Sequence, residues 1–281
     1  CEADSPPIGL QQALAFFVVA AAAQNLLDPS SLSLGQNFLC HTSQKTADHA
    51  RLATLIRNYL NRLNVDLESG DETRETIMRL HWAHSELKRT LPNAPEMGEI
   101  LARVRKRLPR REVPVVNSSQ SPVEFGRQLN FIVGGNILGR GLTIDNLLVT
   151  YYLRRAKVSQ MDTVLQHARM FGYRRPIMPF TRVFVPDALG ARFHFIHIAE
   201  RNLRRQLAAN AGRGRLTVET MSQLRATRLN VLDAQNLAAY EPGHHIYPSE
   251  AGVTKKDLER EGEIEMAVRN AFGGTLREST F

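Results

Sequence analysis

The hydrophobic and polar positions of this 281-residue chain alternate between short apolar runs and longer periodic segments. The short runs predict strands at 37–43, 113–119, 129–135, 146–153 and 181–186. The longer segments carry apolar residues at helical spacing and predict helices at 8–27, 47–63, 71–90, 95–108, 159–171 and 192–209. Because near-continuous apolar strands separated by helices are typical of a buried parallel sheet, the pattern predicts an α/β domain with a mostly parallel sheet.

Two regions depart from this alternation. The polar, periodic segments within 66–110 predict a helical insertion in the domain. From about residue 211 no convincing strand follows, and Thr254 stands three residues before Asp257 in a capping-box-like pattern that predicts a solvated helix. We therefore expect an α/β domain over 1–210 and a helical C-terminal extension over 211–281. The chain begins with CEADSPP rather than with Met, so we expect it to be part of a longer protein.

Composition narrows the class of partner. The chain has 36 Lys and Arg against 28 Asp and Glu, which gives a net charge of +8 and favours an anionic partner, nucleic acid before membrane. The longest apolar run, 13–23, is shorter than the roughly 20 residues that span a bilayer, so it predicts a buried helix and no membrane partner. Cys1 and Cys40 are the two cysteines. They make no disulfide framework, and we expect a reducing, cytoplasmic environment.

The stretch GGNILGRGLTI, residues 134–144, directly follows an apolar run and so resembles a phosphate-binding loop. Gly134 and Gly139 have the spacing of a P-loop. Arg140, however, stands at the position of the P-loop Lys, and Gly141 replaces the hydroxyl residue that binds magnesium. The stretch is therefore either a glycine-rich bend or a motif that faces a nucleotide held elsewhere.

A second group of residues favours a motif that faces a nucleotide held elsewhere. In DTVLQHARMFGYRR, residues 162–175, Gln166, Arg169 and Arg174 follow the glycine-rich stretch by one predicted strand. This order resembles the second motor domain of superfamily-two helicases, with RGLTI similar to motif V and QHARMFGYR similar to motif VI. FLCHTS at the end of the first predicted strand resembles the start of such a domain.

The combination of GGNILGRGLTI, TYYLRR and MDTVLQHARMFGYR is more specifically similar to the Z-one domain family. IGLQQALAFFVVAAAAQNLL and NFLCHTSQKTADH also resemble this family, so that the likeness extends over residues 7–200. Members are attached to helicase-type ATPases of bacterial restriction-like and defence systems and are described as candidate endonucleases. The resemblance implies a RecA-like α/β fold with the helical insertion and helical tail.

The resemblance also implies the chemistry. Arg169 and Arg174 correspond to arginine fingers, which stabilise charge on the γ-phosphate, and Gln166 to a polar organiser. The ATP-facing residues would be Gly139, Gly141 and Thr143, of which Thr143 stands where many helicases carry an acidic ribose contact. ATP and Mg²⁺ would be shared with a P-loop domain of the same longer protein, so this chain alone is expected not to hydrolyse ATP.

DNA is the second expected partner. Thr42, Ser43, Lys45 and Arg140 offer hydroxyls and positive charge to its phosphates. The alternative for Thr42 and Ser43 is a helix N-cap ahead of residue 47.

Two other functions remain open from the sequence. The chain could itself be a metal-dependent endonuclease, acting alone or beside a nuclease subunit, but Asp145, Asp162 and Glu200 are scattered acids without an acid-x-Lys pattern. It could also be a non-catalytic DNA-binding module that uses the basic run RVRKRLPRR at 103–111. As a motor domain, the chain is expected to have a nuclease subunit or domain as a further partner.

Overall fold

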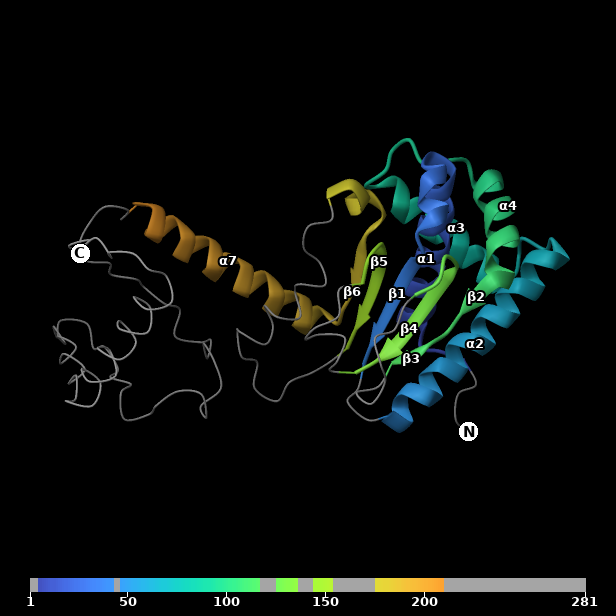
Figure 1. Cartoon of the computed structure of the whole chain (residues 1–281), viewed down its shortest axis with the longest axis horizontal. Helices are drawn as coiled ribbons and strands as arrows, with labels where there is room; N and C mark the ends of the chain where they lie inside the picture. Colours follow the sequence, from blue (N-terminus) through green and yellow to red (C-terminus); the bar gives the residue numbers. More distant parts are fainter. Residues whose placement is uncertain (1–4, 43–45, 117–124, 136–143, 154–174, 210–281) are drawn as a thin grey trace, which may run out of the picture. The chain divides into compact units, whose positions relative to one another are not determined.

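The short apolar runs of the sequence form one parallel sheet (Figure 1). The structure is a computed structural model that describes residues 5–42, 46–116, 125–135, 144–153 and 175–209. Within these ranges the sheet has six strands in the order β2-β4-β1-β5-β6, with β3 also paired to β4, and every pairing is parallel. The strands are β1 (Gln36–His41), β2 (Arg111–Glu112), β3 (Val115–Val116), β4 (Leu129–Gly134), β5 (Leu147–Tyr152) and β6 (Arg182–Phe184). The predicted α/β fold is confirmed, and the arrangement is consistent with a RecA-like domain.

The apolar runs of the sequence correspond to the buried central strands of the sheet. Every residue of β1, β4 and β5 is buried. Of the strand expected over 113–119, the described residues contain the two-residue β3 after Pro114, and the two-residue β2 lies before Pro114 and outside the predicted range. Proline has no N–H to donate to a ladder. Its carbonyl still accepts a 2.9 Å hydrogen bond from the Val133 amide, so the chain stays beside β4.

The helices also follow the predicted segments, with changed ends. They are α1 (Ile8–Leu27), α2 (Thr46–Ser69), α3 (Glu75–Lys88), α4 (Met97–Arg107) and α7 (Asp187–Ala209), with 3-10 turns η1 (Pro29–Ser33), η2 (Leu108–Arg110) and η4 (Arg175–Phe180). The second helix runs to Ser69, six residues beyond its predicted end, and stops at Gly70, whose φ of +69° suits glycine. The expected helical insertion is occupied by α3, α4 and η2, whereas the helix at 159–171 and the tail at 211–281 lie outside the described residues.

The first helix is the centre of the core. By length and composition α1 could cross a membrane, but 83% of its most apolar window is buried inside the protein. Every residue from Ala13 to Asn25 is buried. The Phe17 ring lies 5.6 Å from that of Phe38 in β1 and 5.0 Å from that of Phe131 in β4. The apolar surface on all sides of α1 therefore reflects the burial of this helix inside the domain.

The two faces of the sheet belong to different apolar clusters. Phe38, Phe131 and Val149 belong to the large cluster that also contains residues of α1, α2, α3 and α4. Leu39 and Ile132, one residue along each strand, belong to a smaller cluster with Leu189 of α7. This alternation follows from the two-residue period of a strand.

A network of amide side chains joins the amino ends of the central strands. Asn130 Nδ2 donates to Asn37 Oδ1 at 2.9 Å and to the Gly126 carbonyl at 3.0 Å. Asn146 Nδ2 donates to the Gly35 carbonyl at 3.0 Å and ties the start of β5 to the start of β1. These bonds satisfy polar groups that are buried among apolar residues, and they fix the alignment of three strands.

We predict that Gly35→Ala destabilises the domain. A Cβ at residue 35 would lie 2.2 Å from the Gly126 carbonyl oxygen and 2.9 Å from Asn130 Nδ2, so the amide network would have to shift. Such overpacking costs about 1–3 kcal/mol, which should lower the thermal unfolding midpoint. Gly98→Ala in α4 is the matched control, because its Cβ would meet nothing within 4 Å and Ala favours a helix. Equal midpoints for the two variants would contradict the close contact at Gly35.

Candidate functional site

The three central strands end side by side at the carboxyl edge of the sheet. In register, Cys40 of β1 lies between Val133 of β4 and Tyr151 of β5, and the Leu153 amide donates to the His41 carbonyl at 3.0 Å. Ligands of open α/β sheets bind at this edge, where the loops after neighbouring strands meet. The carboxyl ends of β4, β1 and β5 therefore define the candidate site.

The predicted site residues all lie in segments that follow these three strands. Thr42 comes directly after β1. The glycine-rich stretch starts with the last residue of β4, and QHARMFGYR lies between β5 and η4. Thr42 is within the described residues; the others, Ser43, Lys45, Gly139, Arg140, Gly141, Thr143, Gln166, Arg169 and Arg174, lie outside them. The segments that carry the two motifs nevertheless follow β4 and β5, the strands on either side of β1.

Thr42 carries an unpaired buried hydroxyl. Its Oγ1 is inaccessible to solvent and has no hydrogen-bond partner within the part of the chain that the structure describes. A buried hydroxyl without a partner costs about 1–3 kcal/mol, and such groups in native proteins call for an explanation. A bound ligand that accepts or donates a hydrogen bond here would remove that cost.

The N-cap alternative for Thr42 is wrong. Helix α2 begins at Thr46, so its N-cap position falls at residue 45 and the Thr42 side chain is too early in the chain to take that role. The start of α2 still lies just beyond the carboxyl end of β1. The positive end of its dipole favours an anion at this edge.

The strand ends themselves supply no charge. None of the residues from Cys40 to Thr42, or from Tyr151 to Leu153, is Lys, Arg, Asp or Glu. Burial raises the pKa of the Cys40 thiol to about 12, so it stays protonated, and burial followed by the neighbouring Cys40 raises the pKa of Tyr151. Any charge that acts on a ligand at this edge must therefore come from the loops.

Aromatic rings from neighbouring strands stack at the carboxyl edge of the sheet, a contact that the sequence did not reveal. The His41 ring lies 5.2 Å from the Tyr152 ring at an interplanar angle of 27°, and Tyr152 lies 5.9 Å from Phe193 of α7. His41 and Tyr152 end neighbouring strands in direct register. The sequence signal was a His near the end of one predicted strand and a Tyr near the end of another. The contact between the two rings could not be predicted, because it depends on the order of the strands in the sheet.

The acids considered for metal-dependent cleavage do not gather within the described residues. Asp145 lies at the opposite, amino edge of the sheet, where its carbonyl accepts from Asn37 Nδ2 at 2.5 Å. Glu200 forms an ion pair with Arg204 on α7 at 2.6 Å, and Asp162 lies outside the described residues. No group of three or more His, Cys, Asp or Glu that could hold a metal ion occurs in the described ranges.

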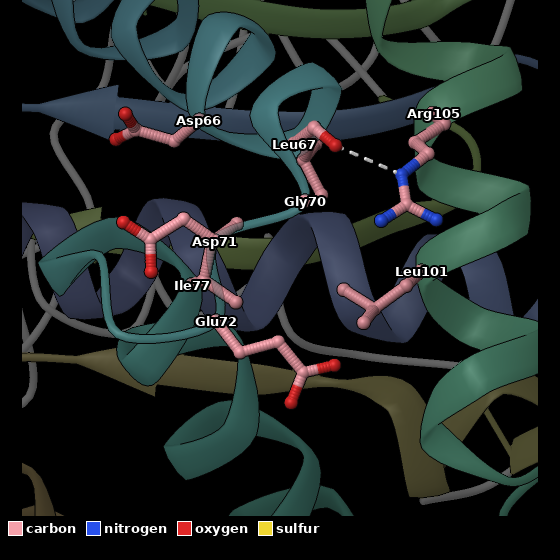
Figure 2. A pocket seen from close by; sticks show the side chains of 8 residues that line it. All are labelled: Asp66, Leu67, Gly70, Asp71, Glu72, Ile77, Leu101 and Arg105. Carbon is pink, nitrogen blue, oxygen red and sulfur yellow. Dashed lines mark hydrogen bonds between the residues drawn. The ribbon is translucent and has the colours of Figure 1, made fainter.

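A hollow near the end of α2 is distinct from this edge. Figure 2 shows Asp66, Asp71 and Glu72 around it, with Arg105 Nε donating to the Leu67 carbonyl at 3.0 Å. The accessible space of about 10 Å³ has room for roughly one water molecule. The hollow is therefore too small for a nucleotide.

We predict that Thr42→Val separates stability from binding. Valine has the shape of threonine without the hydroxyl, so the free protein should keep its stability or gain up to about 1 kcal/mol. Affinity for labelled duplex DNA should fall by about 2- to 10-fold, equivalent to one hydrogen bond. Thr42→Ser, which keeps the hydroxyl, is the control and should retain binding. A clear loss of thermal stability in the valine variant would show instead that the hydroxyl is bonded within the protein.

We also predict that the buried Cys40 thiol makes stability fall with rising pH. The folded-state pKa of about 12 exceeds the ordinary value of about 8.5, so between these values the unfolded chain loses a proton that the folded chain keeps. The free energy of unfolding should decrease by up to about 1.4 kcal/mol per pH unit above pH 9. Thermal unfolding from pH 7 to 10.5 should give a flatter profile for Cys40→Ala than for the unmodified chain. Parallel profiles would contradict this.

Comparison with known proteins identifies the family to which this chain belongs. Comparison with curated proteins and with solved structures gave no match. A family model described as the Z1 domain matches residues 9–232, which confirms the resemblance to the Z-one family. Because this match covers well over half of the 281 residues, the chain belongs to the Z1 domain family.

Proposed function

We propose that this chain is the second motor domain of an ATP-dependent, DNA-acting helicase-like or translocase-like subunit. ATP and Mg²⁺ would be held mainly by a separate P-loop domain, and this chain would complete the site from the opposite side of a cleft. The subunit would belong to a bacterial restriction or defence endonuclease system in the cytoplasm, together with a nuclease subunit or domain.

The observation that carries the proposal is the order of the central strands. The glycine-rich stretch follows β4 and the arginine-bearing stretch follows β5, and both strands are parallel neighbours of β1. The two segments that carry these stretches therefore leave the sheet at one edge, after strands that end at Gly134 and Tyr152. In the described sheet only β1 lies between these two strands, which supports a shared site after them.

The edge has the properties that phosphate binding needs. The buried Thr42 hydroxyl lacks a partner among the described residues, and the start of α2 follows it. The strand ends are buried and carry no Lys, Arg, Asp or Glu, so a charged group brought in by the loops would act in a low-dielectric surrounding. These features suit hydrogen-bond donation to phosphate oxygens.

In this proposal the two arginines act in the transition state. A guanidinium is permanently charged and presents a planar fork of donors, which matches phosphate oxygens. Phosphoryl transfer depends mainly on positioning and on stabilising charge, and Mg²⁺ supplies part of that stabilisation when it is bound with ATP. Arg169 and Arg174 would supply the rest, and Gln166 would orient the reacting groups. Gly139, Gly141 and Thr143 would contact the nucleotide, while Thr42, Ser43, Lys45 and Arg140 would contact DNA.

We predict that Arg169→Ala and Arg174→Ala, made in the longer protein that includes the P-loop domain, lower ATP turnover by about 10³- to 10⁵-fold. Affinity for ATP should change little, because a finger acts mainly in the transition state. Arg89→Ala is the control, since Arg89 forms an exposed ion pair with Glu86 at 3.0 Å in α3. The 281-residue chain alone should show no appreciable ATP hydrolysis.

Three results would contradict the proposal. The first is normal turnover in both arginine variants. The second is robust ATP hydrolysis by this chain alone that is lost in Arg140→Ala, which would identify the glycine-rich stretch as a working P-loop. The third is metal-dependent nicking of DNA by this chain alone, which would establish the endonuclease alternative.

A further inference from the structure

The basic run at 103–111 divides into two sets in the structure. Arg105 donates to the Leu67 carbonyl at 3.0 Å, Arg107 to Gln36 Oε1 at 2.7 Å and Arg111 to the Leu108 carbonyl at 2.9 Å. These three side chains hold elements of the fold together. The remaining members, Arg103, Lys106 and Arg110, form no hydrogen bond or ion pair with any residue in the described ranges.

The positive charges of this segment lie close together. Arg103, Arg107 and Arg110 follow one another at spacings of four and three residues, which places them on one side of α4 and η2. Burial, and then the charges of Arg103 and Arg110, lower the pKa of Arg107. Like charges at such spacings destabilise a helix by a few tenths of a kcal/mol. Folding alone therefore does not favour this arrangement.

Neutral groups hold the centre of the cluster in place. Arg107 bonds the Gln36 side-chain amide and the Arg127 carbonyl, the latter at 3.2 Å, so no carboxylate cancels its charge. Arg127 is itself exposed and lies beside Arg107. Glu99, the acid within α4, is engaged at the other end of that helix, where it accepts from the Glu96 amide at 3.3 Å.

The helix dipole accounts for only part of this charge. Cations in the last turn of a helix are favourable, and Arg105, Lys106 and Arg107 occupy the last turn of α4. Arg103 precedes that turn, Arg110 follows it in η2, and Arg127 lies just before β4. A ligand with several negative charges explains all of them.

The cluster lies at the amino edge of the sheet. Gln36 is the first residue of β1, and Arg127 comes two residues before β4. Because all strand pairings are parallel, this edge is opposite the carboxyl ends where ATP is proposed to face the domain. A ligand bound here would not compete with the nucleotide.

We propose that Arg103, Lys106, Arg110 and Arg127 form a second DNA contact, the amino-edge surface, which binds the phosphate backbone of duplex DNA. The segment from 103 to 110 extends about 10 Å, the axial length of roughly three phosphates of one strand. None of its four members is aromatic, so it offers no platform for stacking on unpaired bases and fits a duplex better than a single strand. The contact is electrostatic and independent of DNA sequence.

The test compares two triple variants of the 281-residue chain with equal loss of charge. Arg103→Gln, Lys106→Gln and Arg110→Gln remove three of the four amino-edge charges and leave Arg127 and the structural Arg105, Arg107 and Arg111 intact. Lys88→Gln, Arg201→Gln and Arg205→Gln, all at exposed positions of α3 and α7, are the matched control. Binding of a labelled 20-base-pair duplex is measured without ATP at several salt concentrations, with circular dichroism and thermal unfolding as checks of the fold.

The amino-edge variant should bind more weakly, and the slope of log affinity against log salt should decrease by about 2–3, since each lost phosphate contact contributes about 0.9. The control should keep most of the slope. Equal slopes for the two variants overturn the proposal. If the triple variant fails to fold, the single variants Arg103→Gln and Arg110→Gln should each lower the slope by about 1, and unchanged slopes overturn it.

A second probe distinguishes DNA from an acidic protein segment. If the amino-edge variant loses binding to a poly-glutamate peptide and keeps binding to the duplex, the surface serves a protein and the proposal is wrong. Because ATP is absent from these measurements, their failure leaves the proposed arginine fingers untouched. A failure of the Arg169 and Arg174 experiment would likewise leave the amino-edge surface untouched.

Discussion

The burial of α1 against the central strands is the interaction on which the rest of the structure depends. Phe17 meets Phe38 of β1 and Phe131 of β4, and every residue from Ala13 to Asn25 is buried. An aromatic side chain buries about 150–250 Å², so this contact contributes heavily to the core. It holds β1 and β4 at fixed positions, and their carboxyl ends are the places where the predicted motifs begin.

The polar side chains at the amino edge and at the carboxyl edge of the sheet differ in their hydrogen bonding. At the amino edge, Asn130 donates to Asn37, and Asn37, Asn130 and Asn146 each donate to nearby carbonyls, which aligns the strands without charge. At the carboxyl edge the described residues leave the Thr42 hydroxyl without a partner. The residues that stabilise the fold and those proposed to bind a ligand therefore lie at opposite ends of the same strands.

Much of the fold could be predicted from sequence, because buried parallel strands read as continuous apolar runs. The strands at β1, β4, β5 and β6 and the full length of α1 agree with the prediction. The short strand β2 before Pro114 and the later end of α2 at Ser69 were missed, since both depend on local backbone geometry. Of the site, the sequence identified Thr42 as a candidate but attributed an alternative capping role to it, which the start of α2 at Thr46 excludes.

By itself the sequence determined the class of fold, the motifs and the excess of positive charge, because these depend on residue type and spacing. Only the tertiary structure decided which strands are neighbours, and hence that the segments after β4, β1 and β5 share one edge. It also decided which arginines of the run at 103–111 are structural and which remain unpaired among the described residues. The reason is that strand order and side-chain pairing depend on contacts between residues far apart in the chain, such as Arg107 with Gln36, which no local pattern records.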